Sequence, residues 1–361
     1  MLTVSHETLR KQLTEVFRAW GIAEDDVEII AANMVESDLR GIDSHGIGML
    51  PRYDEHRKNG AVNVKANVQV LRDFGAIAMI DADHGLGHVP ATRAMRLACD
   101  KAEQFGIGAV SVRNSNHFGA AGVYATMAVE RGFIGLCTTG TTQRSVLPTF
   151  GKEPRYSTNP IAFAAPAKKN DAFSLDMATS TVAVGKLNIA RRAGKPLPIG
   201  WAHDSEGQPT TDPVVALNAV PKRLSPLGGT RELGSHKGYG LAVMVDILSS
   251  TLSGSYIGGY NLATGSREQY INVGHFCMAI NPAAFREEGE FEDELDGLID
   301  MLRATPPANP DQPVLVAGDP EYAEHARRSR NGVPMTDTLA QEVRAVAEEC
   351  GAPYLLGNAV G

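Results

Sequence analysis

Apolar residues recur every three to four positions near the start of the chain, which is the period of an amphipathic helix. Leu9 and Phe17 belong to the first such run, which begins after Ser5, a favourable N-cap residue. A second run with the same period ends at Gly41. The pattern therefore predicts a helical N-terminal unit that leads directly to His45.

Strand and helix patterns alternate over the rest of the chain. The expected strands are 68–71, 76–81, 108–112, 133–138, 161–165, 173–176, 274–280 and 314–316. The expected helices are 50–58, 89–105, 119–131, 181–193, 237–251, 287–303, 320–330 and 336–350. Residues 194–236 are rich in Gly, Pro and Asp and are expected to form one long loop. This mixture predicts an α/β or α+β fold.

The composition of the chain limits which kinds of molecule it is expected to bind and where it is expected to be located. The chain has 361 residues, of which 43% are apolar and 21% charged, and its formal net charge is −8. Without clustered basic residues, nucleic acid is not expected as a partner. No apolar stretch is long enough to predict a membrane span, and no signal peptide is expected. The four cysteines lack C-x-x-C spacing and indicate thiols in a reducing compartment, which predicts a cytoplasmic location: Cys99, Cys137, Cys277 and Cys350.

Two common cofactor motifs and a metal site are not supported. A Rossmann fingerprint would need glycine at the end of Gly85-Leu86-Gly87-His88-Val89-Pro90, and no Gly-Lys pair completes a P-loop. A bound dinucleotide must therefore be held in another way. His84 and His88 are spaced as metal ligands on a helix would be, but two glycines lie between them. We expect loop histidines there and no metal.

Two histidines are candidates for chemistry. Histidine ordinarily titrates near neutral pH, so His45 in Asp43-Ser44-His45-Gly46 is a candidate for acid/base catalysis, the alternative being a loop histidine bonded to backbone. His117 lies between an expected strand and an expected helix, where unpaired backbone N–H groups attract anions. The alternative there is helix capping by Ser115 or Asn116.

Two further turns favour a phosphate-bearing ligand. Lys237 lies in the first turn of a helix that Ser235 is expected to cap, where a cation opposes the helix dipole. A bound phosphate or carboxylate would explain it, and so would an exposed surface lysine. Asp176 leads from a strand toward a helix in the same manner, with Thr179 and Ser180 as the expected caps.

Six motifs in a fixed order resemble one known family. They are Asp43-Ser44-His45-Gly46, Asn116-His117-Phe118-Gly119, Thr158-Asn159-Pro160, Asp176-Met177-Ala178-Thr179-Ser180, Pro209-Thr210-Thr211-Asp212-Pro213 and His236-Lys237-Gly238-Tyr239-Gly240. This order resembles the malate/L-lactate dehydrogenase family that lacks a Rossmann fold. The family also contains sulfolactate, ureidoglycolate and 2,3-diketogulonate oxidoreductases and cyclic imino-acid reductases. The likeness extends from about residue 5 to residue 350.

The resemblance implies a reversible oxidoreductase that uses NAD(H) or NADP(H) and acts on 2-hydroxy or 2-oxo acids. His45 would be the proton donor and acceptor, and His117 would share that role or place the reacting groups. Arg52, Ser44 and Thr158 would contact the substrate. The residues implied to hold the dinucleotide are Asn159, Asp176, Met177, Ala178, Thr179, Ser180, His236, Lys237, Gly318, Asp319 and Pro320.

The resemblance also implies an architecture. A helical N-terminal unit (1–70) carries His45, and a central region (121–240) binds the cofactor on a largely antiparallel mixed sheet without a Rossmann fold. Residues 71–120 and 240–361 would form a region for substrate binding and dimerisation. The expected partners are a small-molecule acid and a second copy of the chain, with the active site near the subunit contact.

One departure from the family pattern concerns the substrate. Many members carry an arginine four residues after the catalytic histidine, but Met49 stands there in this chain. Arg52 is the available replacement, because a methionine cannot make the bidentate bond that arginine makes to a carboxylate. A smaller departure is Ala317-Gly318-Asp319, where Pro-Gly-Glu is common. Malate as the substrate is therefore open, as is NAD against NADP. A cyclic imino-acid reductase acting on piperideine- or pyrroline-2-carboxylate and a non-catalytic dinucleotide-binding protein stay as alternatives.

Overall fold

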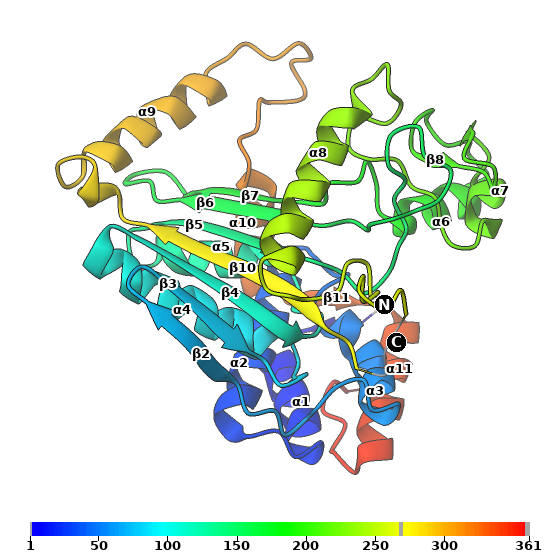
Figure 1. Cartoon of the computed structure of the whole chain (residues 1–361), viewed down its shortest axis with the longest axis horizontal. Coiled ribbons are helices and arrows are strands. Elements are labelled where there is room, and N and C mark those ends of the chain that lie inside the picture. The colour runs from blue at the N-terminus through cyan, green and yellow to red at the C-terminus, as the bar shows by residue number, and fades with distance from the viewer. Residues whose placement is uncertain (1, 267–269, 358–361) are drawn as a thin grey trace.

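The computed structural model describes residues 2–266 and 270–357. Its centre is a seven-stranded mixed sheet in the order β2-β3-β4-β10-β5-β6-β7 (Figure 1). Within it only β3 and β4 run parallel, and every other neighbouring pair is antiparallel. The strands are β2 (Gln69–Phe74), β3 (Ile77–Asp81), β4 (Ile107–Ser115), β5 (Ile134–Thr139), β6 (Ile161–Ala165), β7 (Phe173–Met177) and β10 (Val273–Ile280). The predicted α/β class with a largely antiparallel mixed sheet is confirmed.

Two helices pack closely against this sheet because the contact is built from small residues. They are α4 (His88–Phe105) and α5 (Ala121–Val129). A side chain at Gly108 would overlap the Ala98 carbonyl of α4, and one at Gly135 would overlap the Ala125 carbonyl of α5. The two glycines therefore fix how near each helix can lie to the strands.

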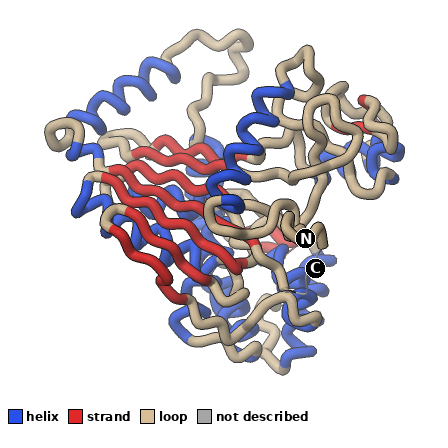
Figure 2. The backbone as a smooth tube through the Cα atoms, in the orientation of Figure 1, coloured by secondary structure: helices blue, strands red, loops and turns tan. Residues whose placement is uncertain are grey.

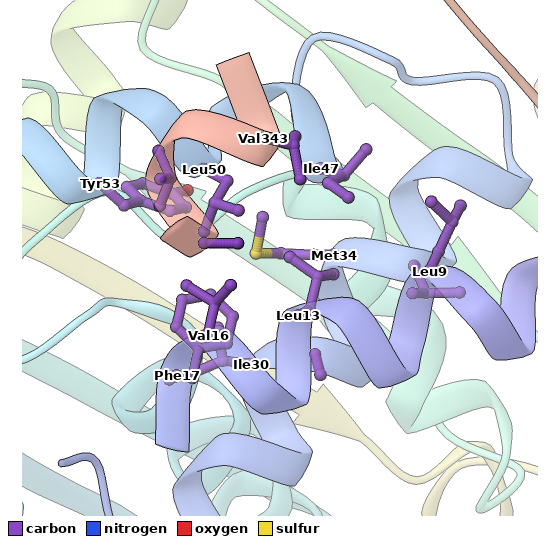
Figure 3. Packing of buried hydrophobic residues seen from close by; sticks show 14 of the residues in the cluster. Leu9, Leu13, Val16, Phe17, Ile30, Met34, Ile47, Leu50, Tyr53 and Val343 are labelled. Carbon is purple, nitrogen blue, oxygen red and sulfur yellow. The ribbon is translucent and has the colours of Figure 1, made fainter. Parts of the chain in front are cut away.

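The N-terminal unit joins both ends of the chain. Ser5 caps α1, as predicted, by accepting a hydrogen bond from the Thr8 N–H at 3.2 Å. The elements are β1 (Leu2–Val4), α1 (His6–Ala19), α2 (Glu24–Leu39), the short 3-10 helix η1 (Ile47–Met49), α3 (Leu50–Lys58), β11 (Val333–Met335) and α11 (Asp337–Cys350). Their buried side chains meet in one apolar cluster, in which Val343 of α11 packs with residues of α1, α2 and α3 (Figure 3). The pairing of β1 with β11 was not predicted.

A third group of elements includes residues 194–236, which were expected to form one long loop. That expectation is wrong in part, because Asp212 caps a short helix by accepting from the Val214 and Val215 N–H groups. The elements are α6 (Val184–Arg192), β8 (Ala202–His203), β9 (Pro209–Thr210), α7 (Pro213–Asn218), α8 (Ser235–Asp246) and a π-helical turn, η2 (Ile247–Thr251). They form a lobe beside the sheet, separate from the N-terminal unit (Figures 1 and 2).

The remaining elements lie in the C-terminal third: η3 (Pro282–Ala284), α9 (Glu290–Arg303) and α10 (Asp319–Asn331). The strand expected at 314–316 is wrong, because the Val316 N–H bonds the Asp319 carboxylate at 2.8 Å instead of a neighbouring strand. None of the described helices is long and apolar enough to cross a membrane. The cysteines predicted as thiols are free, and the cytoplasmic location stays a prediction.

The three-part division also stays a prediction. Buried apolar residues of the described chain form three clusters, in the N-terminal unit, beneath the sheet and in the lobe around α6 and α7. The sheet itself draws strands from 71–120, from 121–240 and from 240–361.

Candidate active site

A cavity of about 290 Å³ brings together the five residues predicted to contact the substrate or perform the chemistry. They arrive from distant parts of the chain: Ser44 and His45 before η1, Arg52 on α3, His117 after β4, and Thr158 before β6. The other lining residues are Met49, Phe118, Gly119, Thr139, Gly140, Thr141, Thr142, Gln143, Ser145, Ser157, Pro160, Val184, Lys222, Leu224 and Val273.

The turn that carries His45 is held by a buried carboxylate. Asp38, at the end of α2, accepts a hydrogen bond from the Ile47 N–H at 2.8 Å. Burial raises the pKa of Asp38 to about 7, against the effect of this hydrogen bond. Gly46 lies so close that any side chain there would overlap the Asp38 carboxylate. The glycine after the histidine is therefore explained by this close approach.

Asp43 does not contribute to orienting His45, although it is only two residues away. Its carboxylate pairs with Arg328 of α10, whose Nη1 also donates to the Asp38 carbonyl at 2.7 Å. The partner of His45 is Ser44 instead, whose hydroxyl lies 2.8 Å from His45 Nδ1. This leaves His45 Nε2 without a hydrogen-bond partner among the described residues.

His117 stacks against His45, with ring centroids 5.3 Å apart. Its Nδ1 accepts from the Gly119 N–H at 3.3 Å and lies 2.7 Å from the Tyr53 hydroxyl. Since a backbone N–H can only donate, Nδ1 is unprotonated, and the proton of the neutral ring is on Nε2. Burial, with a smaller effect from His45, holds the pKa of His117 well below its usual value. His117 is therefore a neutral hydrogen-bond donor.

The charges around the cavity favour an anion. Burial first and the Arg52 guanidinium second lower the pKa of His45. Arg52 is half-buried and has no carboxylate partner among the described residues. Lys222 is the second cation, and its ammonium is held by the Leu217 and Ala219 carbonyls at the end of α7. No Asp or Glu is among the described residues that line the cavity, so a bound acid would supply the missing negative charge.

A buried hydrogen-bond chain behind the cavity wall was not predicted from the sequence. His275 of β10 lies 2.7 Å from the Thr139 hydroxyl through Nδ1 and 2.7 Å from the Ser115 hydroxyl through Nε2. Phe118 stacks on the same ring at 4.6 Å. Ser115 therefore bonds a histidine across the sheet and does not cap α5, as the alternative prediction had it. Asn116 does not cap it either, since its amide bonds the His84 carbonyl at 2.8 Å.

Some of the predicted cofactor residues lie together near the cavity. The Thr179 hydroxyl lies 3.1 Å from the Thr158 carbonyl and 2.9 Å from that of Asn159. Asp176 accepts from the Gly122 N–H at 2.7 Å, and Met177 and Ala178 follow it. Thr179 and Ser180 were predicted as helix caps, which is wrong, because α6 begins later, after Ala183.

The other predicted cofactor residues lie on two separate turns. Gly318 packs beside β7, where the Ser174 N–H bonds the Ala317 carbonyl at 3.0 Å. Asp319, followed by Pro320, forms an ion pair with Arg303 at 2.6 Å. His236 and Lys237 are exposed in the first turn of α8, and Arg231 Nη1 lies 2.9 Å from His236 Nδ1. The predicted cap is wrong, since Gly234 precedes the helix and Ser235 is its first residue.

His84 and His88 were expected to be loop histidines; His84 is in a turn, but for His88 the expectation is wrong, because it is the first residue of α4. His84 Nδ1 lies 3.0 Å from the Ile271 carbonyl, and its ring stacks on Tyr270 at 4.6 Å. His88 is fully buried, packs edge-on against Tyr53, and has no hydrogen-bond partner for either ring nitrogen. Among the residues the structure describes, no group of three potential ligands is close enough to hold a metal ion.

Several known proteins resemble this chain in sequence and in structure. A malate dehydrogenase from Pyrococcus horikoshii is 40% identical over 355 residues, covering 98% of this chain and 97% of that protein. An L-sulfolactate dehydrogenase from Methanocaldococcus jannaschii is 36% identical over 345 residues and 96% of each chain. A solved malate dehydrogenase from Pyrococcus horikoshii superposes with a TM-score of 0.87 at 36% identity, over 98% of this chain and 97% of that one. A Δ1-piperideine-2-carboxylate reductase from Pseudomonas syringae gives a TM-score of 0.82 at 28% identity, over 96% and 100%.

The fold and the similarity over nearly the whole chain are thus those of a dehydrogenase that acts on 2-hydroxy acids. The family model for malate/L-lactate dehydrogenases matches residues 4–344. The chain belongs to the malate/L-lactate dehydrogenase family. Membership implies a nicotinamide cofactor and a small hydroxy or oxo acid as substrate.

Proposed function

We propose that the protein catalyses reversible hydride transfer between a nicotinamide cofactor and C2 of a 2-hydroxy or 2-oxo acid. The observation that carries the proposal is the half-buried, unpaired Arg52 in the same carboxylate-free cavity as His45 and His117. An acid group bound to Arg52 would place the neighbouring oxo group within the same small space as the two histidines. The bidentate geometry of arginine suits a carboxylate.

His45 is the proposed acid/base. Its Nε2 donates a proton to the oxo oxygen during reduction and removes it during oxidation. The Ser44 hydroxyl at Nδ1 holds the ring in place for this transfer. His117, neutral and protonated on Nε2, donates a hydrogen bond to the substrate and stabilises the charge that develops on its oxygen. Thr158 completes the substrate contacts.

The residues around the cavity fit a nicotinamide cofactor. Hydroxyls of Ser145, Ser157 and Thr158 line it without any carboxylate, which suits a carboxamide and an acid together. Bound NADH or NADPH would supply the hydride. We assign the dinucleotide contacts to the set predicted above: Asn159, Asp176, Met177, Ala178, Thr179, Ser180, His236, Lys237, Gly318, Asp319 and Pro320. The choice between NAD and NADP is left to measurement.

A homodimer is part of the proposal. Leu241 and Met244 on α8 and Ile247 at the start of η2 follow one another at three-residue spacing and are exposed, Ile247 to 53%. An exposed apolar row on a helix is typical of a protein interface. A second copy of the chain is the occupant that the family resemblance implies.

The likeness to the piperideine-2-carboxylate reductase supports a second candidate, reduction of a cyclic imino acid. It would use the same carboxylate contact at Arg52, with the proton delivered to nitrogen. One experiment separates the two candidates: oxidation of NADH and of NADPH is followed with pyruvate, oxaloacetate, 3-sulfopyruvate and piperideine-2-carboxylate. Turnover of the 2-oxo acids supports the proposal. Turnover of the imine alone supports the reductase, and turnover of none favours a non-catalytic binding protein.

The His45→Ala variant tests the assigned role in the same assay. We expect turnover to fall by about 100-fold or more, because one general acid/base is lost, while the dissociation constant of the reduced cofactor changes little. His6→Ala is the matched control, because His6 is in α1 and lines no part of the cavity. Unchanged turnover in His45→Ala would remove His45 from the mechanism.

A further inference from the structure

A second cavity, of about 160 Å³, adjoins the catalytic one. The two cavities share four lining residues, so they lie against each other: Arg52, Thr142, Gln143 and Val273. The remaining walls of the second cavity are His56, Tyr256, Gly259, Tyr270, Ile271 and Asn272. None of the residues assigned to the dinucleotide lines it, which leaves it free for another part of the bound ligands.

Helix α3 places the residues that separate the two cavities. Met49, Arg52 and His56 are three and four residues apart, so they lie along one side of the helix. Met49 lines only the catalytic cavity, His56 only the second one, and Arg52 lines both. Tyr53, one position further along, is buried and contacts His117. The Arg52 guanidinium therefore stands at the junction, with five N–H donors that can serve an acid group on either side.

The described walls of the second cavity offer donors. Among the described residues that line it there is no Asp or Glu. The half-buried His56 ring has no hydrogen-bond partner among the described residues. Asn272 is oriented by its Oδ1, which accepts from the Asn114 N–H at 2.8 Å, and its amide nitrogen has no partner within the described chain. Unsatisfied donors gathered around an unpaired cation are the chemistry that an anionic group requires.

One wall of this cavity is held by His84, one of the two histidines considered above as metal ligands. His84 stacks on Tyr270 at 4.6 Å and lies 3.0 Å from the Ile271 carbonyl. The same segment is tied at Asn272, whose carbonyl accepts from the Tyr256 N–H at 3.0 Å. These contacts hold the segment opposite α3 and give the cavity a defined shape. His84 thereby has a structural role beside the proposed binding site.

We propose that the second cavity is a distal subsite for the second acidic group of a dianionic 2-oxo acid, with His56 as its specificity residue. The first carboxylate binds Arg52 on the catalytic side, and the distal carboxylate or sulfonate binds His56, Asn272 and the other side of Arg52. A volume equal to about five water molecules accommodates an acid group with one or two methylenes. This subsite rests on the function proposed above.

His56→Leu tests the subsite, because leucine fills similar space and removes the ring donors. Steady-state kinetics with the full chain and the preferred cofactor compare pyruvate, which has one acid group, with oxaloacetate and 3-sulfopyruvate, which have two. We expect the KM of the two dianions to rise about ten-fold with kcat little changed, because a hydrogen bond to a charged group is lost. For pyruvate, kcat/KM stays within about two-fold.

Two further variants keep the result interpretable. His56→Gln retains a donor and should restore most of the affinity for the dianions, which a purely structural role of His56 would not predict. His6→Leu carries the same substitution outside both cavities and should leave the kinetics with either kind of substrate unchanged.

Equal losses for pyruvate and for the dianions in His56→Leu, or no loss for either, would overturn the subsite. If the unaltered protein reduces no 2-oxo acid, the proposed function fails and the subsite fails with it. If it reduces pyruvate and His56→Leu has no effect, the subsite alone fails.

Discussion

The Tyr53 hydroxyl lies 2.7 Å from Nδ1 of His117, although the two residues are 64 positions apart in the chain. The Gly119 N–H also donates to this nitrogen, which therefore carries no proton. The tyrosine hydroxyl must then be a donor as well. Burial raises the pKa of Tyr53, so this donor stays protonated over the whole working range of pH. The contact fixes which nitrogen of His117 carries the proton offered to a ligand.

Tyr53→Phe removes that donor and keeps the ring. We expect turnover to fall about ten-fold, since His117 loses one of the two contacts that select its tautomer. Binding of the reduced cofactor should stay within about two-fold. Turnover and cofactor titration on the same preparation check both. Full activity in Tyr53→Phe would mean that the Gly119 N–H alone is sufficient.

Arg52→Met should alter the pH dependence of the reaction as well as substrate affinity. The positive charge of Arg52 contributes to lowering the pKa of His45, so removing it raises that pKa. Oxidation of the hydroxy acid needs neutral His45, and its rate therefore rises with pH through this pKa. The rising limb of kcat/KM against pH should move to higher pH in the variant. A limb that stays in place would show that another group titrates.

Asp38→Asn should change how stability depends on pH. Burial raises the pKa of Asp38 from 3.8 to about 7, so between these values the folded protein keeps a proton that the unfolded chain has lost. The free energy of unfolding of the natural protein consequently falls as pH rises through this window, by on the order of 1–4 kcal/mol. Asparagine retains an oxygen for the Ile47 N–H and does not titrate. Urea unfolding at the two ends of the window should show a smaller decrease for the variant.

Gly46→Ala should disturb the turn that carries His45. The added methyl group overlaps the Asp38 carboxylate, and neither group can move away while Asp38 bonds the Ile47 N–H. We expect a loss of about 2–4 kcal/mol in the free energy of unfolding, together with a fall in turnover. Gly297→Ala in α9 is the control, because a methyl group there meets no atom within 4 Å. That variant should gain up to about 1 kcal/mol.

Lys237→Ala tests the cofactor assignment at the start of α8. The exposed ammonium has no partner among the described residues, so a phosphate contact is the interaction at stake. If Lys237 binds the dinucleotide, the dissociation constant of the reduced cofactor should rise about five- to ten-fold, with the difference shrinking at high salt. Lys11→Ala on α1 is the control for loss of one surface charge. Equal dissociation constants in the natural protein and Lys237→Ala would leave Lys237 as a surface residue.

The spacing of apolar residues along the chain was sufficient to predict most of the helices, because each helix buries one side against the rest of the molecule. The helix predicted at 50–58 matches α3, and Ser5 caps α1 as expected. Short elements were predicted less well. The strand β11 has three residues and is paired only through β1 at the other end of the chain, so no local pattern marks it. The expected strand at 314–316 had the right residues but no neighbouring strand to bond.

The candidate site shows the same limit. The motifs selected His45, His117, Arg52 and Thr158, and one cavity contains all four. Tyr53 escaped notice because its importance comes from a contact across the fold. Asp43 shows the opposite case: it is two residues from His45 in sequence, but Arg328 binds it. Helix-cap residues such as Ser235 were also misassigned, since their hydroxyls bond groups outside the local turn.

The pairing of β1 with β11 and the packing of α11 against α3 have a consequence for synthesis on the ribosome. The turn with His45 is translated early, but Arg328, β11 and α11, which pack around it, are translated near the end. A nascent chain would carry the proposed acid/base residue without the walls that position it until these later segments have been made. Catalytic competence should therefore appear in one late step, after the C-terminal helix has left the exit tunnel.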